Sequence, residues 1–355
     1  MNYQLNLLPL SFELETKKVL KKATKAHIAL AELKGVCRTI PNEEILVNTL
    51  VLQEAKESSA IENIITTHDE LFRAEISKEK ISKETKEVLN YASALHLGFQ
   101  LVRDNQFLSN NFILKIQNKL EENQAGFRKL PGTVLKNDQT GEVVHTPPQD
   151  YASILALMNN LEAFINNETD ETDVLVKMAV IHYQFETIHP FYDGNGRTGR
   201  IINILYLVLN KLLDFPILYL SRYIIQNKTD YYRLLQTVKT ENKWEEWLLY
   251  MLEGIEQTSK ETIILIEKIS QLMDKYKQEI REKLPKIYSK DLLENLFKHP
   301  YTKIEYLQND LKCSKNTAIT YLKALSENDF LVKYKVGKET FYLNQPLFDL
   351  FTNKK

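Results

Sequence analysis

The 355-residue chain is poor in the residues that interrupt helices or cross-link small domains. It has ten glycines, ten prolines and two cysteines, Cys37 and Cys313, which lie far apart in the sequence. Because Gly and Pro are few and Leu, Ile, Lys and Glu are abundant, we expect a mainly α-helical protein. Two distant cysteines form no disulfide framework and lack the spacing of a zinc site, which fits a reducing, cytoplasmic location.

The chain also lacks a charge excess and a long apolar run. Its formal net charge is −1, so the whole chain is not a polyanion-binding protein, and any surface for nucleic acid must be local. The longest apolar stretch, residues 201–213, is interrupted by Asn203, Asn210 and Lys211 and is too short to span a bilayer. It predicts a buried helix. The N-terminus has no basic segment followed by an apolar core, so we expect no signal peptide and no contact with a membrane.

The length favours two or three domains, because a single hydrophobic core rarely serves so many residues. We assign residues 1–95 to an N-terminal helical segment and residues 96–255 to a central helical core. In the first segment a helix is expected to start near Pro41, with Asn42 available as its cap. The helices expected in the central core cover residues 112–121, 173–188 and 198–213.

One stretch of the central core interrupts the helical pattern. Residues 133–135 and 142–145 are β-prone, and the segment 137–141 between them has the Asn, Asp and Gly of a turn. This arrangement predicts a small β-hairpin, which ends at Pro147 and Pro148.

Two further units follow the core. Residues 256–285 are assigned to a linker helix with one apolar stripe, which indicates packing on neighbouring elements or, alternatively, the seam of a homodimer. The stripe consists of Leu265, Ile269, Leu272, Tyr276 and Ile280. Residues 286–355 contain three predicted short helices followed by a β-hairpin, which is the pattern of a winged helix-turn-helix domain. The three helices are expected at residues 290–297, 303–311 and 314–328.

The winged-helix unit has a mild basic bias, with 12 Lys against 8 acidic residues and no Arg. Side chains of the types that contact phosphates and base edges lie on or beside its third helix. They are Lys312, Lys315, Asn316, Thr317, Thr320 and Lys323. The absence of Arg weighs against readout of bases, so both DNA and a protein remain as partners of this unit.

The most informative segment is the twelve-residue loop 189–200, which has the features of an anion-binding site. Gly194 and Gly196 permit a backbone that turns its N–H groups inward. A predicted helix starts directly after them, so its free N–H groups and its dipole point at the same place. Arg197 and Arg200 are three residues apart, and their planar guanidinium groups suit phosphate oxygens. The loop does not have the sequence of a P-loop.

Two more side chains of the loop complete a site for phosphate chemistry. Asp193 is a lone carboxylate beside the expected phosphate site, which is the usual position of a Mg²⁺ ligand. His189 is the only nearby group that can act as a base near neutral pH. The loop alone therefore indicates phosphoryl-type chemistry with a metal and a histidine base, rather than a turn that only caps a helix.

The loop resembles the signature of the Fic family, His-x-Phe-x-(Asp/Glu)-Gly-Asn-Gly-Arg-x-x-Arg, at every specified position. Residues 182–188 are similar to the helix that precedes this motif, and the resemblance covers roughly residues 1–255. It implies transfer of AMP from ATP to a Ser, Thr or Tyr hydroxyl of a target protein or of the chain itself. In this reaction His189 would be the base, Asp193 would hold Mg²⁺, and Phe191 would anchor the loop in the core.

The resemblance also implies how the nucleotide is held. The implied nucleotide-binding residues of the loop are Gly194, Asn195, Gly196, Arg197, Thr198, Gly199 and Arg200. The Gly-Asn-Gly segment would cradle the α- and β-phosphates and stabilise the developing charge, and the two arginines would hold the β- and γ-phosphates. Tyr231 and Tyr232 resemble the aromatic pair on the adenine side of the family's site, with packing in the core as the alternative.

The predicted hairpin falls where the family carries its flap. In relatives the flap holds the backbone of the target beside the phosphate by strand addition. The flap residues expected to contact the target are Val143, Val144, His145 and Thr146. For His145 an exposed turn histidine is the alternative.

A second family pattern, (Ser/Thr)-x-x-x-Glu-(Gly/Asn), matches the segment that runs from Ser58 through Glu62 to Asn63. In relatives this helix lies over the ATP site and its Glu pairs with the second Arg of the loop, which is Arg200 here. An Arg that is held by a carboxylate cannot also bind a γ-phosphate, so the resemblance implies autoinhibition by Glu62. Ser58 would cap or support Glu62, and an ordinary surface Glu is the alternative.

The sequence therefore predicts a mainly α protein: a Fic-type helical core with a β-hairpin flap, followed by a winged helix-turn-helix domain. The predicted function is ATP-dependent protein adenylylation, restrained by Glu62. Three alternatives remain: transfer of another nucleotide or of phosphocholine, removal of AMP, and a DNA-binding regulator whose core senses nucleotide.

Overall fold

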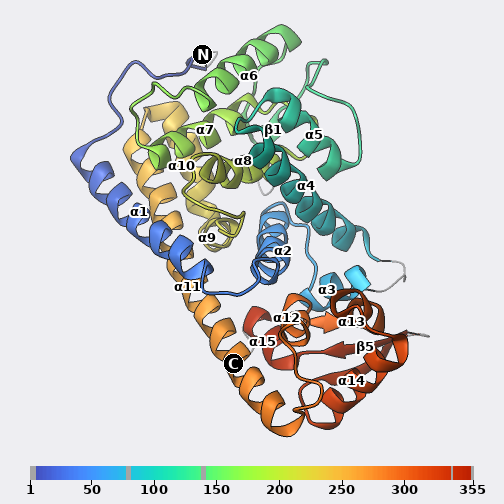
Figure 1. Cartoon of the computed structure of the whole chain (residues 1–355). Coiled ribbons are helices and arrows are strands. Elements are labelled where there is room, and N and C mark those ends of the chain that lie inside the picture. The colour runs from blue at the N-terminus through green and yellow to red at the C-terminus, as the bar shows by residue number, and fades with distance from the viewer. Residues whose placement is uncertain (1–4, 77–80, 137–140, 337–338, 353–355) are drawn as a thin grey trace.

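The computed structural model describes residues 5–76, 81–136, 141–336 and 339–352, and it is mainly α-helical, as predicted (Figure 1). The N-terminal segment forms α1 (Lys17–Cys37), α2 (Glu44–Ile61), α3 (His68–Ile76) and α4 (Lys83–Asn105). The central core forms α5 (Asn110–Glu121), α6 (Tyr151–Ile165), α7 (Val174–Ile188), α8 (Asn195–Leu209), α9 (Ser221–Gln226) and α10 (Lys228–Glu241).

Several of these helices begin at a side chain that satisfies a free N–H group of the first turn. The capping residues of α1, α4, α5, α6 and α7 are Thr16, Ser82, Ser109, Asp150 and Asp173. Asn42 has the related role that the sequence predicts, because its side-chain oxygen accepts a hydrogen bond of 3.0 Å from the N–H of Glu44.

Helix α7 lies at the centre of the core, and nearly all of its side chains are buried. Helices α6 and α8 pack against it, as does α11 (Trp244–Lys283). Trp247 of α11 is fully buried, and its indole N–H donates to the carbonyl of Ala179 at 2.9 Å. The packing of α7 fixes the point at which the chain leaves the core and enters the loop at His189.

Helix α8 starts and ends earlier than predicted. It starts at Asn195 because Gly194, with a φ of 75°, makes the turn into the helix. It ends at Leu209 because Lys211 adopts a φ of 59° and the N–H of Leu212 returns to the carbonyl of Leu207. In the described part of the chain, neither α8 nor any other helix is long and apolar enough to cross a membrane.

The predicted linker helix is the C-terminal part of α11, residues 256–283, and α11 runs without a break over 40 residues. The helix starts earlier than expected, at Trp244, and Gly254 within it packs closely on Tyr223 of α9. Of the stripe, Ile269, Tyr276 and Ile280 are buried, and Tyr276 packs on Phe297 and Phe330 of the C-terminal unit of the same chain. The stripe therefore packs on neighbouring elements, which is the first of the two alternatives.

The C-terminal unit has the element order of a winged helix-turn-helix domain, as predicted. Its elements are α12 (Lys290–Lys298), β3 (Tyr301–Thr302), α13 (Ile304–Leu311), α14 (Lys315–Glu327), β4 (Val332–Val336), β5 (Glu339–Leu343) and α15 (Gln345–Thr352). The three strands form an antiparallel sheet in the order β3-β5-β4. The sequence did not reveal β3 or α15, and residues 337–338 of the predicted hairpin lie outside the described residues.

The small hairpin of the core is also present. Strands β1 (Leu135–Lys136) and β2 (Val143–His145) pair antiparallel, with Leu135 opposite His145. Residues 137–140, which belong to the predicted turn, lie outside the described residues.

Helix α2 lies between the core and the C-terminal unit (Figure 1). On one side it contacts α4, α8 and α9, and on the other it contacts α12. This arrangement connects the C-terminal unit to the residues 58–63 that the sequence singles out.

Tyr276 anchors the C-terminal unit on α11. Its buried hydroxyl lies 3.0 Å from both the carbonyl of Phe330 and the side-chain oxygen of Asn344. Tyr276→Phe removes this donor from two buried acceptors, so we expect the free energy of unfolding to fall by about 1–3 kcal/mol. Chemical denaturation followed by circular dichroism measures the change. The matched control is Tyr334→Phe, whose hydroxyl makes no hydrogen bond within the described chain, and equal losses in both variants would contradict this role.

Candidate active site

His189 occupies a strained position at the end of α7. It adopts a left-handed backbone with a φ of 48°, which costs energy for a residue with a side chain. Within the described residues its Nδ1 atom has no hydrogen-bond partner. Burial is the main cause that lowers the pKa of His189 from 6.5 to about 4, and the positive charge of Arg128 contributes to the shift. The ring is therefore neutral at neutral pH, which is the state that a general base requires.

Asn195 closes the loop on itself. Its side-chain oxygen accepts from the N–H of Phe191 at 2.8 Å, and its amide donates to the carbonyl of the same residue at 2.9 Å. Phe191 is fully buried between Phe127 and Phe185, so it anchors the loop as the resemblance implies. The side chain of Asn195 is thus used within the loop, and only its backbone N–H is left to face an anion.

The N-terminus of α8 forms the glycine-containing turn at which the sequence predicts anion binding. Gly194 takes the left-handed conformation there, and its N–H donates to the Asp193 carboxylate at 2.7 Å. A side chain at Gly196 would collide with the carboxylate of Glu62, so glycine allows another group to approach this backbone closely. Thr198 and Gly199 are buried in the first turn of the helix.

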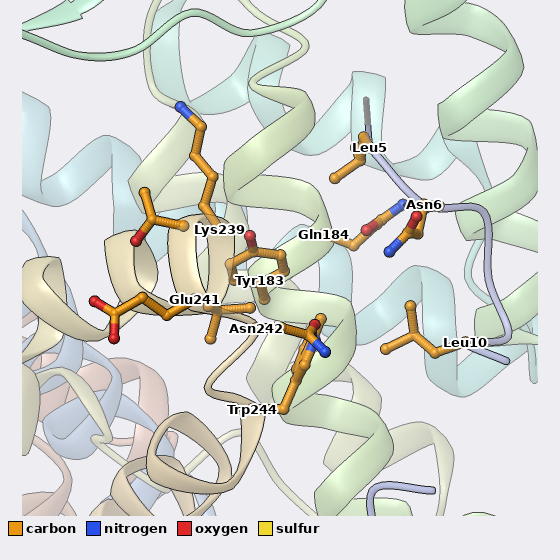
Figure 2. Close-up of a pocket in the computed structure, with 11 residues that line it drawn as sticks. Leu5, Asn6, Leu10, Tyr183, Gln184, Lys239, Glu241, Asn242 and Trp244 are labelled. Atoms are coloured by element: carbon orange, nitrogen blue, oxygen red, sulfur yellow. Dashed lines mark hydrogen bonds between the residues drawn. The ribbon is translucent and has the colours of Figure 1, made fainter. Parts of the chain in front are cut away.

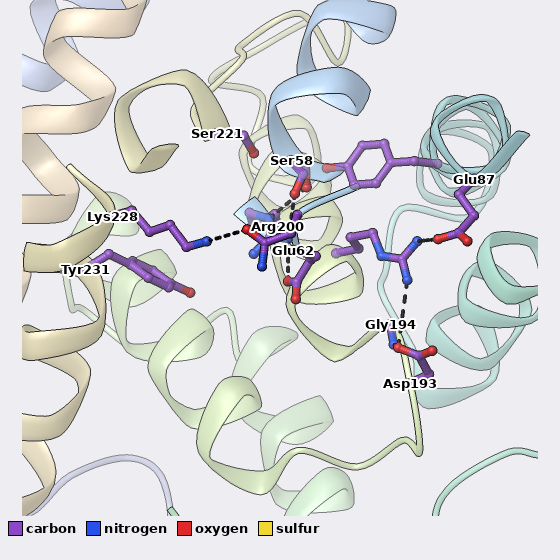
Figure 3. Close-up of polar contacts among 12 residues, drawn as sticks. Ser58, Glu62, Glu87, Asp193, Gly194, Arg200, Ser221, Lys228 and Tyr231 are labelled. Carbon is purple, nitrogen blue, oxygen red and sulfur yellow. Dashed lines mark hydrogen bonds and ion pairs between the residues drawn. The ribbon is translucent and has the colours of Figure 1, made fainter. Parts of the chain in front are cut away.

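Arg197 is buried and held by two acids that the sequence did not identify. Its guanidinium lies 2.9 Å from the Glu121 carboxylate at the end of α5. It also lies 3.3 Å from Glu87 of α4, which is labelled in Figure 3. Burial raises the pKa of Glu121 although Arg197 opposes the shift. A phosphate that binds Arg197 would therefore compete with these two carboxylates.

Arg200 is fully buried and is held by the segment 58–63, as the resemblance implies. Its Nε donates to the Ser58 hydroxyl at 2.7 Å, and its second amino group donates to the Ser58 carbonyl at 3.0 Å and to Glu62 at 2.8 Å (Figure 3). Burial favours the neutral form of Glu62, but the charge and hydrogen bond of Arg200 lower its pKa below the ordinary value. Asn63 accepts a hydrogen bond of 3.4 Å from Lys228 of α10 at the edge of this cluster.

Two further acids, the buried Glu54 and the half-buried Glu186, lie around Arg200. Burial raises the pKa of both Glu54 and Glu186 to about 7, and Arg200 partly offsets this effect in each. Glu54 accepts hydrogen bonds from Tyr91 and Ser221, which fixes α2 against α4 and α9. One carboxylate oxygen of Glu186 has no hydrogen-bond partner in the described part of the chain.

The two tyrosines of the predicted adenine pair have different surroundings. Tyr231 is buried, and its hydroxyl lies 2.8 Å from Nε2 of His182, whose Nδ1 lies 3.1 Å from the amide of Asn203. For Tyr231 the structure therefore shows core packing, the alternative interpretation. Tyr232 is 47% exposed on the adjacent position of α10.

The flap residues are divided between the surface and the core. Val143, Val144 and Thr146 are exposed, as a surface for a target requires. His145 is not an exposed turn histidine, because its Nε2 lies 2.8 Å from the carbonyl of Thr187 in the last turn of α7. Burial lowers the pKa of His145 to about 4, so its ring is neutral at neutral pH. The neutral ring connects the flap to the last turn of α7.

Asp193 is the candidate metal ligand, and its side chain is 77% exposed. In the described residues no group of three or more His, Cys, Asp or Glu side chains is suited to hold a metal. A single exposed carboxylate fits Mg²⁺, which commonly takes one or two protein carboxylates and completes its shell with phosphate oxygens and water.

A separate pocket of about 250 Å³ lies beside α7, between the N-terminal segment and the junction of α10 with α11 (Figure 2). Figure 2 shows Tyr183, Gln184, Asn6 and Trp244 in its lining, where Gln184 donates to the carbonyl of Asn6 at 2.8 Å and the Tyr183 ring packs 4.7 Å from that of Trp244. No residue of the loop 189–200 lines this pocket, so it is distinct from the anion-binding turn.

Sequence reasoning missed the side chains that surround the loop. Glu54, Glu87, Glu121 and Arg128 come from four different segments and belong to no recognisable short motif. Glu186 lies within residues 182–188, which resemble the helix before the motif, but that resemblance assigned it no role.

Three family models match successive parts of the chain. The N-terminal model of the Fic/DOC family matches residues 20–100, and the Fic/DOC family model matches residues 107–207. The C-terminal domain of the SoFic-like protein adenylyltransferases matches residues 272–347.

Curated relatives and solved structures agree with these matches. A probable protein adenylyltransferase of Aquifex aeolicus is 31% identical over 166 residues, which are 44% of this chain and 50% of that protein. Protein adenylyltransferase Fic of Aedes aegypti is 28% identical over 180 residues, 49% of this chain and 33% of that protein. The chain thus spans half or less of the length of these relatives.

Two solved structures share the fold. A Fic family protein from Desulfovibrio desulfuricans G20 has a TM-score of 0.60 at 18% identity and covers 93% of this chain and 96% of its own. Fic-1 of C. elegans has a TM-score of 0.55 at 19% identity and covers 70% and 73%. With the complete loop 189–200, the three successive family matches and the shared fold, the chain belongs to the Fic/DOC family.

Proposed function

We propose that the chain is a protein adenylyltransferase, which moves AMP from ATP to a Ser, Thr or Tyr hydroxyl of a target protein and of itself. The observation that carries the proposal is a neutral, half-buried His189 beside a helix N-terminus suited to anions and flanked by Arg197 and Arg200. The names of the curated relatives support it.

The reaction follows from these groups. The target hydroxyl oxygen attacks the α-phosphorus of ATP, the bond to the bridging oxygen of the β-phosphate breaks, and pyrophosphate leaves. The imidazole of His189 takes the hydroxyl proton. Backbone N–H groups at the start of α8 stabilise the charge on the phosphate oxygens. Mg²⁺, held by Asp193, would neutralise part of the phosphate charge.

We assign the flap to binding of the target protein and the aromatic pair to binding of the adenine. Strand β2 pairs only with β1 among the described strands, so we assign its other edge, with Val143, Val144 and Thr146, to the backbone of the target. We assign contact with adenine to the exposed Tyr232, and a supporting role to the buried Tyr231 behind it.

Glu62 acts in this proposal as a brake. It occupies Arg200 through a charge-assisted hydrogen bond of 2.8 Å, and Ser58 takes two more of the guanidinium's donors. A γ-phosphate needs the same donors, so ATP binds in an unproductive position until Glu62 withdraws.

The first test uses wild type, Glu62→Gly and Glu62→Gly/His189→Ala with Mg²⁺ and α-labelled ATP. Glu62→Gly should raise AMP labelling roughly tenfold or more, because it frees Arg200. The added His189→Ala should lower the rate on the order of 10²–10⁴-fold while ATP still binds. Intact mass and gel readout measure transfer, and calorimetry measures ATP binding. If ATP binds and no variant is labelled, another donor or the regulator hypothesis takes the place of adenylylation.

Helix α2, which Glu62 directly follows, is also held by the C-terminal unit. Glu44 at its start forms an ion pair with Lys298 of α12, and Gln53 donates to the carbonyl of Phe351 at 3.4 Å. Directly after α2, Phe72 of α3 packs its ring 6.0 Å from that of Phe348. We therefore extend the proposal: the C-terminal unit keeps α2, and with it Glu62, on Arg200.

Reversing a charge at this contact tests the extension. Lys298→Glu faces Glu44 with a like charge, so labelling should rise roughly threefold or more in otherwise wild-type protein. The double variant Lys298→Glu/Glu44→Lys should return towards wild type. The matched control is Lys290→Glu on the same helix, since Lys290 pairs only with Glu294 of α12 among described residues. If adding Lys298→Glu to Glu62→Gly raises labelling above that of Glu62→Gly alone, the contact does not act through Glu62.

A further inference from the structure

Helix α7 ends with carbonyl groups that have lost their helical partners, and residues outside the motif satisfy them. The Arg128 side chain donates from Nε to the His189 carbonyl at 2.8 Å and from an amino group to the Ile188 carbonyl at 3.5 Å. The backbone N–H of Arg128 donates to the carbonyl of Pro190 at 2.8 Å. His145 of the flap takes the carbonyl of Thr187. Four successive carbonyls are thereby satisfied.

Arg128 is an unusual residue for this position, because its side chain is fully buried and no carboxylate pairs with it in the described part of the chain. A buried cation without an anion is costly. Partial compensation comes from the negative end of the α7 dipole and from the carbonyls that it binds. A buried Leu or Met would fill the space without this cost but could not donate hydrogen bonds, which indicates that the bonds themselves are needed.

The same guanidinium also reaches the flap. An amino group of Arg128 donates to the carbonyl of Pro148 at 2.9 Å, three residues after the end of β2. One side chain therefore ties the end of α7, the left-handed His189 and the segment that leaves the flap. The base and the surface assigned to the target are held at a fixed distance by this residue.

We propose that Arg128 is a positioning residue for transfer: it holds His189 in its left-handed conformation and sets the flap relative to it. This inference rests on the proposed function but uses a residue outside the family motif. The groups that face His189 are Arg128, His145 of β2 and Glu62 of α2. Burial is the main cause of the low pKa of His189, and the charge of Arg128 shifts it in the same direction.

The test places Arg128→Lys and Arg128→Gln in the Glu62→Gly background. Because a small misplacement of a reacting group costs about 10²-fold in rate, both variants should lower kcat by about that factor, with KM for ATP changed less than about threefold. Removing the charge raises the pKa of His189, so the rate of Arg128→Gln should begin to fall at a higher pH on acidification. Arg128→Lys keeps the charge, so its rate should fall on acidification at the same pH as that of the Glu62→Gly parent. We call this falling part of the pH profile the acid limb.

A direct titration of the His189 ring by NMR gives a readout that needs no transfer. An upward shift of its pKa in Arg128→Gln, with a smaller shift in Arg128→Lys, supports the inference even if no donor is found. The matched control is Lys129→Gln, which removes a neighbouring but exposed charge and should leave kcat, the acid limb and the titration unchanged. If Arg128→Gln fails to fold, the kcat of Arg128→Lys and the titration of His189 in that variant test the proposed role of Arg128. Unchanged kcat and titration in a folded Arg128 variant, or equal effects of Lys129→Gln, would overturn the role.

Discussion

The buried guanidinium of Arg200 is the constraint on which much of this structure depends. A fully buried positive charge is tolerated only if acceptors surround it. Here the acceptors are the hydroxyl and carbonyl of Ser58 and the carboxylate of Glu62, and all belong to the end of α2. The packing of α2 on the core therefore supplies the acceptors of Arg200. A ligand that binds Arg200 must replace these acceptors.

The loop itself is built to keep its shape without a ligand. The amide of Asn195 closes it through Phe191, and Arg128 and His145 satisfy the carbonyls where α7 ends. The strained backbone of His189 is thus supported from several sides before any substrate arrives. Such preorganisation is what electrostatic stabilisation of a transition state requires, because the groups need not rearrange during the reaction.

Helix α2 joins two parts of the molecule that are far apart in sequence. Its first turns contact the winged-helix unit, and its last turn contacts the loop. Glu54 in its middle is buried between Tyr91 and Ser221, so a shift of the helix would expose or unpair a carboxyl group. The position of this helix is therefore set jointly by the core and by the C-terminal unit.

The sequence by itself determined the helical class, the hairpin, the winged-helix order and the loop 189–200, because these depend on local periodicity, turn residues and a long contiguous motif. A second motif was enough to predict that Glu62 meets Arg200. Only the tertiary structure decided that Arg197 is held by Glu87 and Glu121, that Tyr231 is in the core, and that Arg128 supports His189. These contacts join residues some 50 to 110 positions apart, and a lone Glu or Arg on a surface-like segment carries no sign of its distant partner. The spacing of neighbouring residues predicts local structure and contiguous motifs, whereas burial and long-range pairing are decided only when the helices pack.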